Sequence, residues 1–342
     1  MKNKIDSQLK RFAADIDKLY ALNRVSPLLS KCIKDFILRD GKRIRPILFV
    51  CGYMGFSRKP APGLYTSALS IELLHDFMLV HDDIIDKSEK RRGKPSMHKL
   101  LDSFLSGHKN IKFNGADLGL VAGDVMYAIA IKAFLSIKED MDRKEKALHK
   151  FIEAAIYTGA GEFIELFNGA RNIEKITKND IYKIYDYKTA YYTFSTPLST
   201  GAILAGAHQI QIDKLFSLGI YLGRAFQIKD DILGMFSEEK KIGKSTLSDL
   251  QESKKTLLVW LAYKNAHAKQ KSYIRGLLAK ANVNKGDLAK IRKISIQTGA
   301  LEKATKEIRA LTNKAQALIL SSSISKNYKL FLLNYSRQLL GL

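Results

Sequence analysis

The sequence predicts an all-α fold. Proline, which breaks helices, occurs at only 6 of 342 positions, and none lies beyond Pro197. Apolar residues recur at helical spacings, whereas the period-two alternation typical of strands is weak throughout. These observations favour one all-α domain that spans residues 1–342 and contains roughly a dozen helices.

The helical periodicity is clearest in a series of segments between residues 64 and 320. They are 64–86, 118–137, 145–168, 179–206, 215–233, 254–280 and 301–320. In the fifth of these, Leu215, Leu218, Leu222 and Phe226 contribute to one broad apolar face. Stretches rich in glycine, proline and polar residues predict loops at 56–63, 87–95, 106–115, 168–173, 208–213 and 237–248.

The charge balance is strongly basic. With 57 Lys and Arg against 34 Asp and Glu, the formal net charge is +23. Such an excess fits nucleic-acid binding, an anionic membrane surface or anionic substrates. It also fits lysines on solvated helix faces, because the basic residues are scattered rather than massed in one block. Since no nucleic-acid-binding motif is present, we expect no nucleic-acid partner.

The two cysteines, Cys32 and Cys51, are too few for a disulfide framework or a cysteine-based zinc site. The first residues contain no apolar core of a signal peptide, and no apolar run approaches the roughly 20 residues that span a bilayer. We therefore expect a cytoplasmic protein without a transmembrane segment.

The first acidic motif, DDIID at 82–86, ends an apolar segment. On a helix Asp82 and Asp86 share one face, where two carboxylates repel each other unless a cation lies between them. Oxygen ligands suit Mg²⁺, which also retains waters and binds substrate phosphates. Asp83 points about 100° away, so we expect it to support the ligands rather than bind the metal. The alternative is a charged helix end, because several charged residues follow directly.

The second acidic motif lies about 150 residues later, at DDILG (230–234). Gln227 and Asp231 are four residues apart and Asp230 is three residues past Gln227, and apolar Phe226 and Ile228 flank Gln227. This spacing predicts a polar stripe on a buried helix. Gln227 alone would suit a satisfied core residue, whereas with Asp230 beside it a polar pocket is favoured.

Basic residues accompany both acidic motifs. They are Lys42, Arg43 and Arg45 in GKRIRP, then Arg91, Arg92, Lys188, Lys244 and Lys254. Combined with Mg²⁺-binding carboxylates, such cations would form a diphosphate site, in which arginine binds bidentately and lysine acts as a point charge. Each basic pair alone is also typical of a solvated surface.

The order of these motifs resembles the trans-isoprenyl diphosphate synthases, the polyprenyl synthetase family, and in particular archaeal-type geranylgeranyl diphosphate synthases. The matching elements, in order, are GKRIRP (41–46), His75, DDIID (82–86), RRG (91–93), His98, GD (123–124), KT (188–189), FQIKDD (226–231), GK (243–244) and Lys254. The resemblance implies an isoprenoid synthase fold: an antiparallel helix bundle around a deep central cavity, made by a single polyprenyl synthetase domain over 1–342 and usually found as a homodimer.

The resemblance also assigns roles to residues. Asp82 and Asp86 would bind two Mg²⁺ ions and Asp230 a third, with Asp83 and Asp231 behind these ligands. The cations expected around the allylic diphosphate are Arg91, Lys188, Lys244 and Lys254. The residues expected to bind isopentenyl diphosphate are Lys42, Arg45, His75 and Arg92. Thr189 and Gln227, with Lys188, would face the allylic carbon.

The implied reaction is the head-to-tail condensation of isopentenyl diphosphate with an allylic diphosphate. Cations would stabilise the charge that develops on the leaving diphosphate, so that the allylic C–O bond ionises. The double bond of isopentenyl diphosphate would then attack the carbocation, and a proton would be lost to the released diphosphate. Water must be kept from the cation, which suits carboxylates on buried helices.

The residues before the first motif suggest the product length. Phe77 lies five residues before Asp82, about 7.5 Å along a helix axis, and Met78 is adjacent. A single aromatic at this position, with no insertion in DDIID, resembles archaeal geranylgeranyl diphosphate synthases. Because methionine is flexible, a longer product such as geranylfarnesyl diphosphate is the alternative, as is farnesyl diphosphate. Phe77 also suits simple core packing.

Two departures from the family pattern and two competing functions remain. The second motif ends in Gly234, where many family members have aspartate, and 102–117 resembles a surface insertion. A class I terpene cyclase also uses DDxxD but needs no second diphosphate site. A non-catalytic partner subunit would tend to lose its acidic motifs, and both are intact here.

Overall fold

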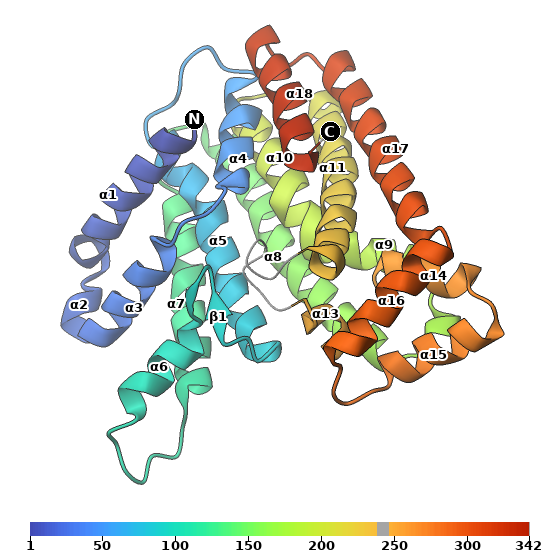
Figure 1. The fold of residues 1–342 in the computed structure, drawn as a ribbon. Helices are drawn as coiled ribbons and strands as arrows, with labels where there is room; N and C mark the ends of the chain where they lie inside the picture. Colours follow the sequence, from blue (N-terminus) through green and yellow to red (C-terminus); the bar gives the residue numbers. More distant parts are fainter. Residues whose placement is uncertain (238–245, 342) are drawn as a thin grey trace.

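Helices build almost the whole of the structure, a computed structural model that describes residues 1–237 and 246–341 (Figure 1). The N-terminal helices are α1 (Lys2–Tyr20), α2 (Leu22–Val25), α3 (Pro27–Ile37), α4 (Ile44–Met54), α5 (Leu64–Ile85), α6 (Met97–Leu105), α7 (Gly115–Phe134) and α8 (Met141–Ala170). The middle of the chain contains η1 (Ile173–Lys175), α9 (Lys178–Ile184), η2 (Tyr185–Ser195), α10 (Thr196–Leu204) and α11 (Gln209–Phe236). The C-terminal helices are α13 (Ser248–Gln251), α14 (Leu257–Asn265), α15 (Ala268–Leu278), α16 (Lys285–Gln297), α17 (Ala300–Ser321) and α18 (Lys326–Leu340). The all-α prediction is confirmed.

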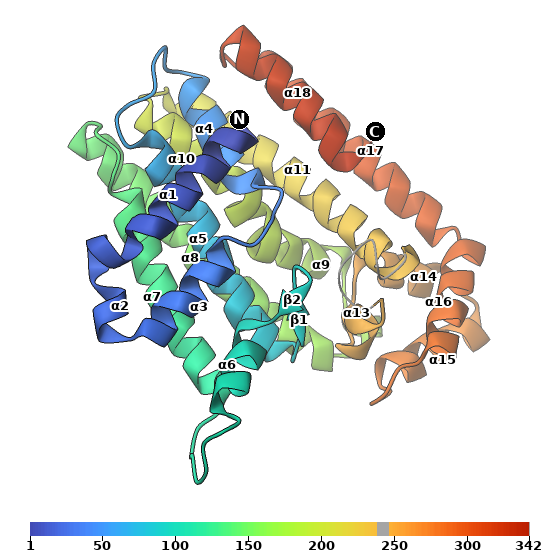
Figure 2. The ribbon, with the colours of Figure 1, turned by 60° about the vertical axis from the view of Figure 1, so that its left-hand side comes forward.

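The long helices α5, α7, α8 and α11, with the shorter α10, form the centre of the bundle (Figures 1 and 2). Helix α5 packs chiefly against α7, α10 against α4, and α11 against η2 and α17. A large cluster of buried aliphatic and aromatic side chains forms the core between them. Helices α14, α15 and α16 lie together at one side, and α1 to α3 lie at the other (Figure 1). Within the described residues, no helix is both long and apolar enough to cross a membrane.

Several helices begin at residues whose side chains satisfy the free backbone N–H groups. Asn114 caps α7 and Thr177 caps α9, each with an aspartate three residues later that completes a capping box. Ser26 caps α3, where Pro27 occupies the first turn. These local signals fix the helix starts independently of tertiary packing.

Two predicted segments differ from the structure. The predicted 254–280 helix is wrong as one element, because α14 ends at Asn265 and α15 begins at Ala268 with a capping box between His267 and Gln270. The predicted 179–206 helix is one helical run, but its centre, η2, is π-helical. Wide π-helical turns occur often at functional sites.

The predicted 87–95 loop contains the two short strands of the described chain, β1 (Lys90–Arg91) and β2 (Lys94–Pro95). Between them Arg92 and Gly93 both have positive φ angles, 54° and 76°. Two left-handed central residues are typical of a tight type I′ hairpin. The turn reverses the chain directly after α5 and presents Arg91 and Arg92 beside that helix.

Candidate functional site

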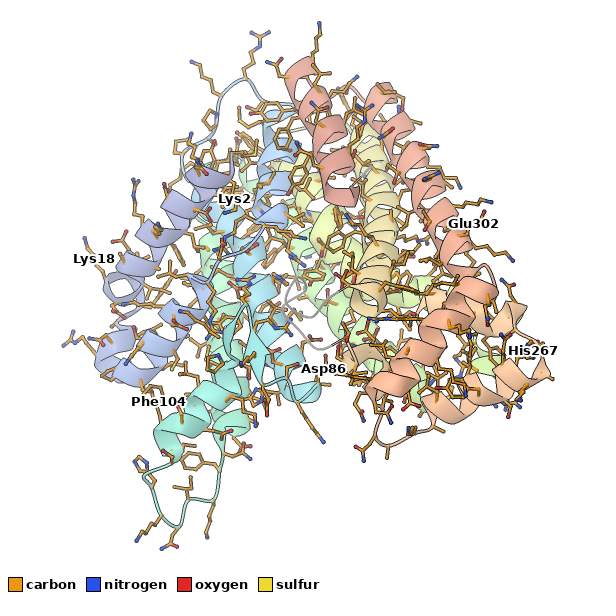
Figure 3. All side chains as sticks on the ribbon, viewed as in Figure 1. Lys2, Lys18, Asp86, Phe104, His267 and Glu302 are labelled. Carbon is orange, nitrogen blue, oxygen red and sulfur yellow. The ribbon has the colours of Figure 1, made fainter. Side chains whose placement is uncertain are left out.

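The first acidic motif forms the C-terminal end of α5 (Figure 3). Asp82 and Asp86 are half-buried, whereas Asp83 is fully buried. Arg91 pairs with Asp83 and lies 3.3 Å from Asp82 Oδ2 through its Nη2 atom. Asp83 is therefore held in the interior by Arg91, and its expected supporting role stays a prediction.

A third carboxylate that the sequence analysis missed completes the acidic cluster. Oxygens of Asp82, Asp86 and Glu162 of α8 all lie within 4.8 Å of one another. Among the described residues, Glu162 Oε1 is buried without a hydrogen-bond partner. Its sequence signal was weak: Glu162 and Glu165 are two carboxylates one helical turn apart in an otherwise apolar segment.

Lys188 of η2 joins the carboxylates of α5 and α8. Its Nζ atom lies 2.5 Å from both Glu162 Oε2 and Glu165 Oε2, and 3.4 Å from Asp82 Oδ1. Burial lowers the pKa of Lys188, but Glu165, Asp82 and Glu162 raise it well above its ordinary value. Lys188 therefore stays charged inside the site.

A glycine permits this close approach of α8 to η2. A Cβ atom on Gly161 would lie 2.5 Å from the backbone nitrogen of Lys188, a distance that real Cβ contacts do not reach. Any larger residue would push α8 away from η2 and move Glu162 away from Lys188.

Lys254 approaches the same cluster from the segment before α14. It pairs with Glu252, and its Nζ lies 3.7 Å from Asp86 Oδ2 and 3.8 Å from Glu165 Oε2. Burial lowers the pKa of Lys254, but Glu165, Asp86 and Glu252 raise it above its ordinary value. Lys188 and Lys254, both predicted site cations, thus lie on either side of the first motif.

The two outer carboxylates of the first motif differ in their pKa values. Burial raises the pKa of Asp82, but Lys188 and Arg91 lower it by more, so the pKa lies below its ordinary value. Burial and repulsion from Asp82 raise the pKa of Asp86. Burial also raises the pKa of Glu162. These carboxylates repel one another when all are ionised, so a cation shared between them would stabilise their charged forms.

This cluster suits Mg²⁺. All of its donors are carboxylate oxygens, their spacing allows one ion to contact more than one residue, and a buried oxygen of Glu162 has no protein partner in the described chain. Asp82, Asp86 and Glu162 are therefore the residues that would hold the metal on this side.

The second acidic motif lies on α11. Asp231 is buried and accepts hydrogen bonds from the Tyr185 hydroxyl and, at 2.9 Å, from Gln227 Nε2, whereas Asp230 is exposed. Burial raises the pKa of Asp231 to about 8, and the nearby Asp249 adds to the rise. Asp231 is thus held inside the packing of α11, and Asp230 lies at its surface. The expected roles, with Asp230 as the metal ligand and Asp231 behind it, stay a prediction. A Cβ on Gly234 would lie 3.0 Å from Asp249 Oδ2, so a second carboxylate approaches the motif there.

One stretch of η2 connects the two acidic motifs. Tyr185 bonds to Asp231, Lys188 contacts Asp82, and Thr189 Oγ1 donates a 2.7 Å hydrogen bond to Gln227 Oε1. Predicted site residues that are 38 (Thr189 and Gln227) and 106 (Asp82 and Lys188) positions apart in sequence are thereby brought together. Tyr185 was not predicted, because an aromatic in an apolar segment is indistinguishable from core.

A second group of predicted residues meets at the other end of η2. Arg45 Nη2 donates 2.8 Å hydrogen bonds to the Tyr192 hydroxyl and to Thr193 Oγ1, and its guanidinium stacks over the Tyr192 ring. The Tyr192 hydroxyl also lies 3.2 Å from His75 Nδ1. Burial, together with Arg45 and Arg92, lowers the pKa of His75 well below its ordinary value. His75 is therefore a neutral hydrogen-bonding group at pH 7.

Arg92 turns from the β-hairpin toward the same group. It lies 3.4 Å from Asp76 Oδ1 and 3.9 Å from Glu72 Oε1, two buried carboxylates of α5. A Cβ on Gly41 would lie 3.5 Å from the Arg92 guanidinium carbon, so GKRIRP and RRG are adjacent in space. Lys42 is exposed, with its Nζ 6.0 Å from the centre of the Phe226 ring on α11. Glu72 and Asp76 were not predicted, because the arginines that pair with them lie on other segments of the chain.

The predicted chain-length residues lie on α5, upstream of Asp82. Phe77 is half-buried, with its ring centre 5.2 Å from that of Tyr127 on α7 and 4.6 Å from that of His81. Met78 is also half-buried against the core. Tyr127 was not predicted. Lys244 lies outside the described residues.

Comparisons with known proteins show the family of the chain. A family model described as polyprenyl synthetase matches residues 26–295. The chain is 33% identical over 265 residues to a geranylgeranyl diphosphate synthase of Saccharolobus solfataricus, covering 75% of this chain and 74% of that one. It is 30% identical over 306 residues to a geranylfarnesyl diphosphate synthase of Aeropyrum pernix, covering 85% and 86%.

A solved structure shares the fold. A geranylgeranyl pyrophosphate synthase from Corynebacterium glutamicum, crystallised with isoprenyl diphosphate and magnesium, superposes with a TM-score of 0.89 at 25% identity, covering 99% of this chain and 97% of that chain. The predicted isoprenoid synthase fold is confirmed.

Proposed function

Because the chain belongs to the polyprenyl synthetase family and is a trans-prenyltransferase, we propose that it condenses isopentenyl diphosphate with an allylic diphosphate to give mainly geranylgeranyl diphosphate. The observation that supports this most strongly is the contact of η2 with both acidic motifs, through Lys188 and Asp82 on one side and Tyr185 and Asp231 on the other. One helical segment thereby contacts the cations and carboxylates that would form the proposed diphosphate site.

The residues divide into two diphosphate-binding groups. Arg91, Lys188 and Lys254, all held beside the first motif by carboxylates, would surround the allylic diphosphate, together with Lys244. Arg45, His75 and Arg92, with Lys42, would bind isopentenyl diphosphate. The neutral His75 would contribute a hydrogen bond rather than a charge. Thr189, fixed by Gln227, would lie near the reacting carbon.

Ionisation of the allylic C–O bond transfers its electron pair to the leaving diphosphate. Lys188 and Arg91 would stabilise that charge, because they are already oriented by their carboxylate partners and need not reorganise. The carbocation is then attacked by the double bond of isopentenyl diphosphate, forming the new C–C bond. The proton lost from the adjacent carbon would pass to the released diphosphate.

Three Mg²⁺ ions per site would supply further positive charge to the diphosphate. Two would be held by Asp82 and Asp86, and one by Asp230 from α11. Glu162 extends the first of these carboxylate groups.

The length of the product would be set by Phe77, with Met78 beside it. Phe77 packs against Tyr127, so the tail would meet two aromatic rings about 7.5 Å along α5 from Asp82. The identity to geranylgeranyl diphosphate synthases supports a C20 product. Because Met78 is flexible and the Aeropyrum relative is a geranylfarnesyl diphosphate synthase, a longer product is the alternative. Farnesyl diphosphate is the remaining alternative.

A homodimer is the proposed assembly. Ile156, Phe163 and Phe167 form one stripe along α8 and are 62%, 71% and 63% exposed. Such a row of large apolar side chains is typical of a surface that a second copy covers. Phe163→Asp should lower the mass measured by light scattering to that of one chain, and an unchanged mass would contradict the proposal for this face.

The cytoplasmic location also stays a proposal.

The two competing functions lack support. A terpene cyclase or a non-catalytic partner subunit would not need Arg45, His75 and Arg92 gathered beside an intact acidic motif. The test is incorporation of labelled isopentenyl diphosphate by the purified protein with each allylic diphosphate. Condensation should require Mg²⁺ and stop with EDTA. No condensation under any of these conditions would contradict the enzyme assignment.

A further inference from the structure

The loop between α6 and α7, residues 106–114, extends beyond the helices at one end of the molecule (Figures 1 and 2). Its base is fixed. Asp102 Oδ1 accepts a 2.7 Å hydrogen bond from the Gly115 backbone, and Asn114 caps α7. These bonds tie the end of the loop to α6 and α7, so the tip projects from a defined place on the molecule.

Large apolar side chains occupy this exposed end. Phe104, labelled in Figure 3, lies near the end of α6. It is 38% exposed, and Ile111 and Phe113 in the loop are 39% and 45% exposed. Exposing three such side chains within ten residues costs solubility and needs a reason. They are separate in sequence from the α8 stripe proposed as the dimer face.

Cations surround these apolar residues. Lys109 and Lys112 are exposed in the loop, and the sequence has no acidic residue between Asp102 and Asp117. Lys31 of α3 places its Nζ 5.5 Å from the centre of the Phe104 ring. Unlike Lys188 and Lys254, these lysines are not part of the candidate active site, so they belong to the large part of the +23 charge that the site leaves unexplained.

We propose that this end of the molecule, residues 104–113 with Lys31, docks on an anionic lipid surface. Phe104, Ile111 and Phe113 would enter the boundary between headgroups and acyl chains, while Lys109 and Lys112 contact lipid phosphates. The mixture of aromatic, aliphatic and cationic side chains at a projecting tip fits a lipid boundary better than a nucleic acid, because Ile111 cannot stack on a base. The proposal does not depend on the reaction that the protein catalyses.

The test is co-sedimentation of the full-length protein with vesicles. Binding should be strong to phosphatidylcholine vesicles that contain about 30% phosphatidylserine, weak without the anionic lipid, and reduced by salt. A double variant, Lys109→Gln with Lys112→Gln, should bind about 10- to 30-fold more weakly, since each lysine near such a surface contributes roughly a factor of five. The variant Ile111→Ser with Phe113→Ser should also lose binding.

A charge-matched control separates the effect of the loop lysines from general electrostatic attraction between the basic protein and anionic vesicles. Lys269→Gln with Lys285→Gln removes the same charge from exposed positions elsewhere and should leave binding within about twofold of the unmodified protein. Equal losses in both lysine variants, or no preference for anionic vesicles, would overturn the proposal. A loop variant that changes the oligomeric mass but keeps vesicle binding would instead assign the loop to a second copy of the chain. All variants alter exposed positions, and circular dichroism verifies that they fold.

Discussion

Lys188 Nζ lies 3.4 Å from Asp82 Oδ1, which joins the π-helical η2 to the end of α5. The same ammonium contacts Glu162 and Glu165 at 2.5 Å, so one cation faces three carboxylates. The three carboxylates carry more negative charge than Lys188 neutralises, so the cluster can attract additional cations. Within the proposed site, this contact is where metal binding and diphosphate binding meet.

Asp82→Asn should reduce the rate of condensation by about a thousandfold or more, because it removes a carboxylate that would hold the metal and neutralise Lys188. The melting temperature should change little, since Asp82 is only half-buried. Steady-state kinetics with isopentenyl diphosphate and farnesyl diphosphate measures the effect. Asp142→Asn, at an exposed position on α8, serves as the control. A rate within tenfold of the unmodified protein would contradict the ligand role.

Glu162→Gln should raise the Mg²⁺ concentration that gives half-maximal activity by roughly tenfold, with a smaller effect on the rate at saturating Mg²⁺. The amide keeps the size of the side chain, and Glu165 still orients Lys188. Measuring activity over a range of Mg²⁺ concentrations separates the effect on the half-maximal concentration from the effect on the saturated rate. If the half-maximal concentration does not move, Glu162 serves only to position Lys188.

Phe77→Ala should shift the product toward longer chains, because it removes the ring that packs against Tyr127. Tyr127→Ala should give a smaller shift in the same direction, since the Phe77 ring would remain but lose its support. Chromatography of the dephosphorylated products separates these cases. Product lengths unaffected by Phe77→Ala would show that the tail does not reach this position.

Lys255→Met should change how stability depends on pH. Lys255 is 9% exposed, and burial lowers its pKa to about 8 from an ordinary value of 10.5. Between these two values the unfolded chain binds a proton that the folded chain has released, so stability rises with pH there. The full difference corresponds to roughly 3 kcal/mol at most.

Lys255→Met removes the titrating group and with it this rise in stability. Its stability relative to the unmodified protein should therefore fall as pH rises from 8 to 10.5. Urea unfolding at several pH values measures the difference. Loss of the hydrogen bond from Lys255 to the Gly169 carbonyl lowers the variant's stability by a pH-independent amount, which leaves the slope as the informative quantity. A constant difference across this range would contradict the lowered pKa.

The sequence predicted those features that depend on local spacing. Asp82 and Asp86 share a face because they are four residues apart, and the polar stripe of Gln227 and Asp231 follows the same rule. Glu162 was missed because its place beside Asp82 depends on the close approach of α8 to η2 at Gly161, a tertiary contact. The break between α14 and α15 was missed because an apolar pattern continues through it, while the cap at His267 is a weak signal.

The length of the product formed from isopentenyl diphosphate and farnesyl diphosphate with Mg²⁺ tests the account most directly. Chromatography of the chains released by phosphatase should show geranylgeraniol as the main product, and EDTA should abolish it. A main product well beyond C20 would contradict the proposed role of Phe77. So would a main product of farnesol when the same assay starts from a primer shorter than farnesyl diphosphate. The absence of any Mg²⁺-dependent condensation would contradict the account as a whole.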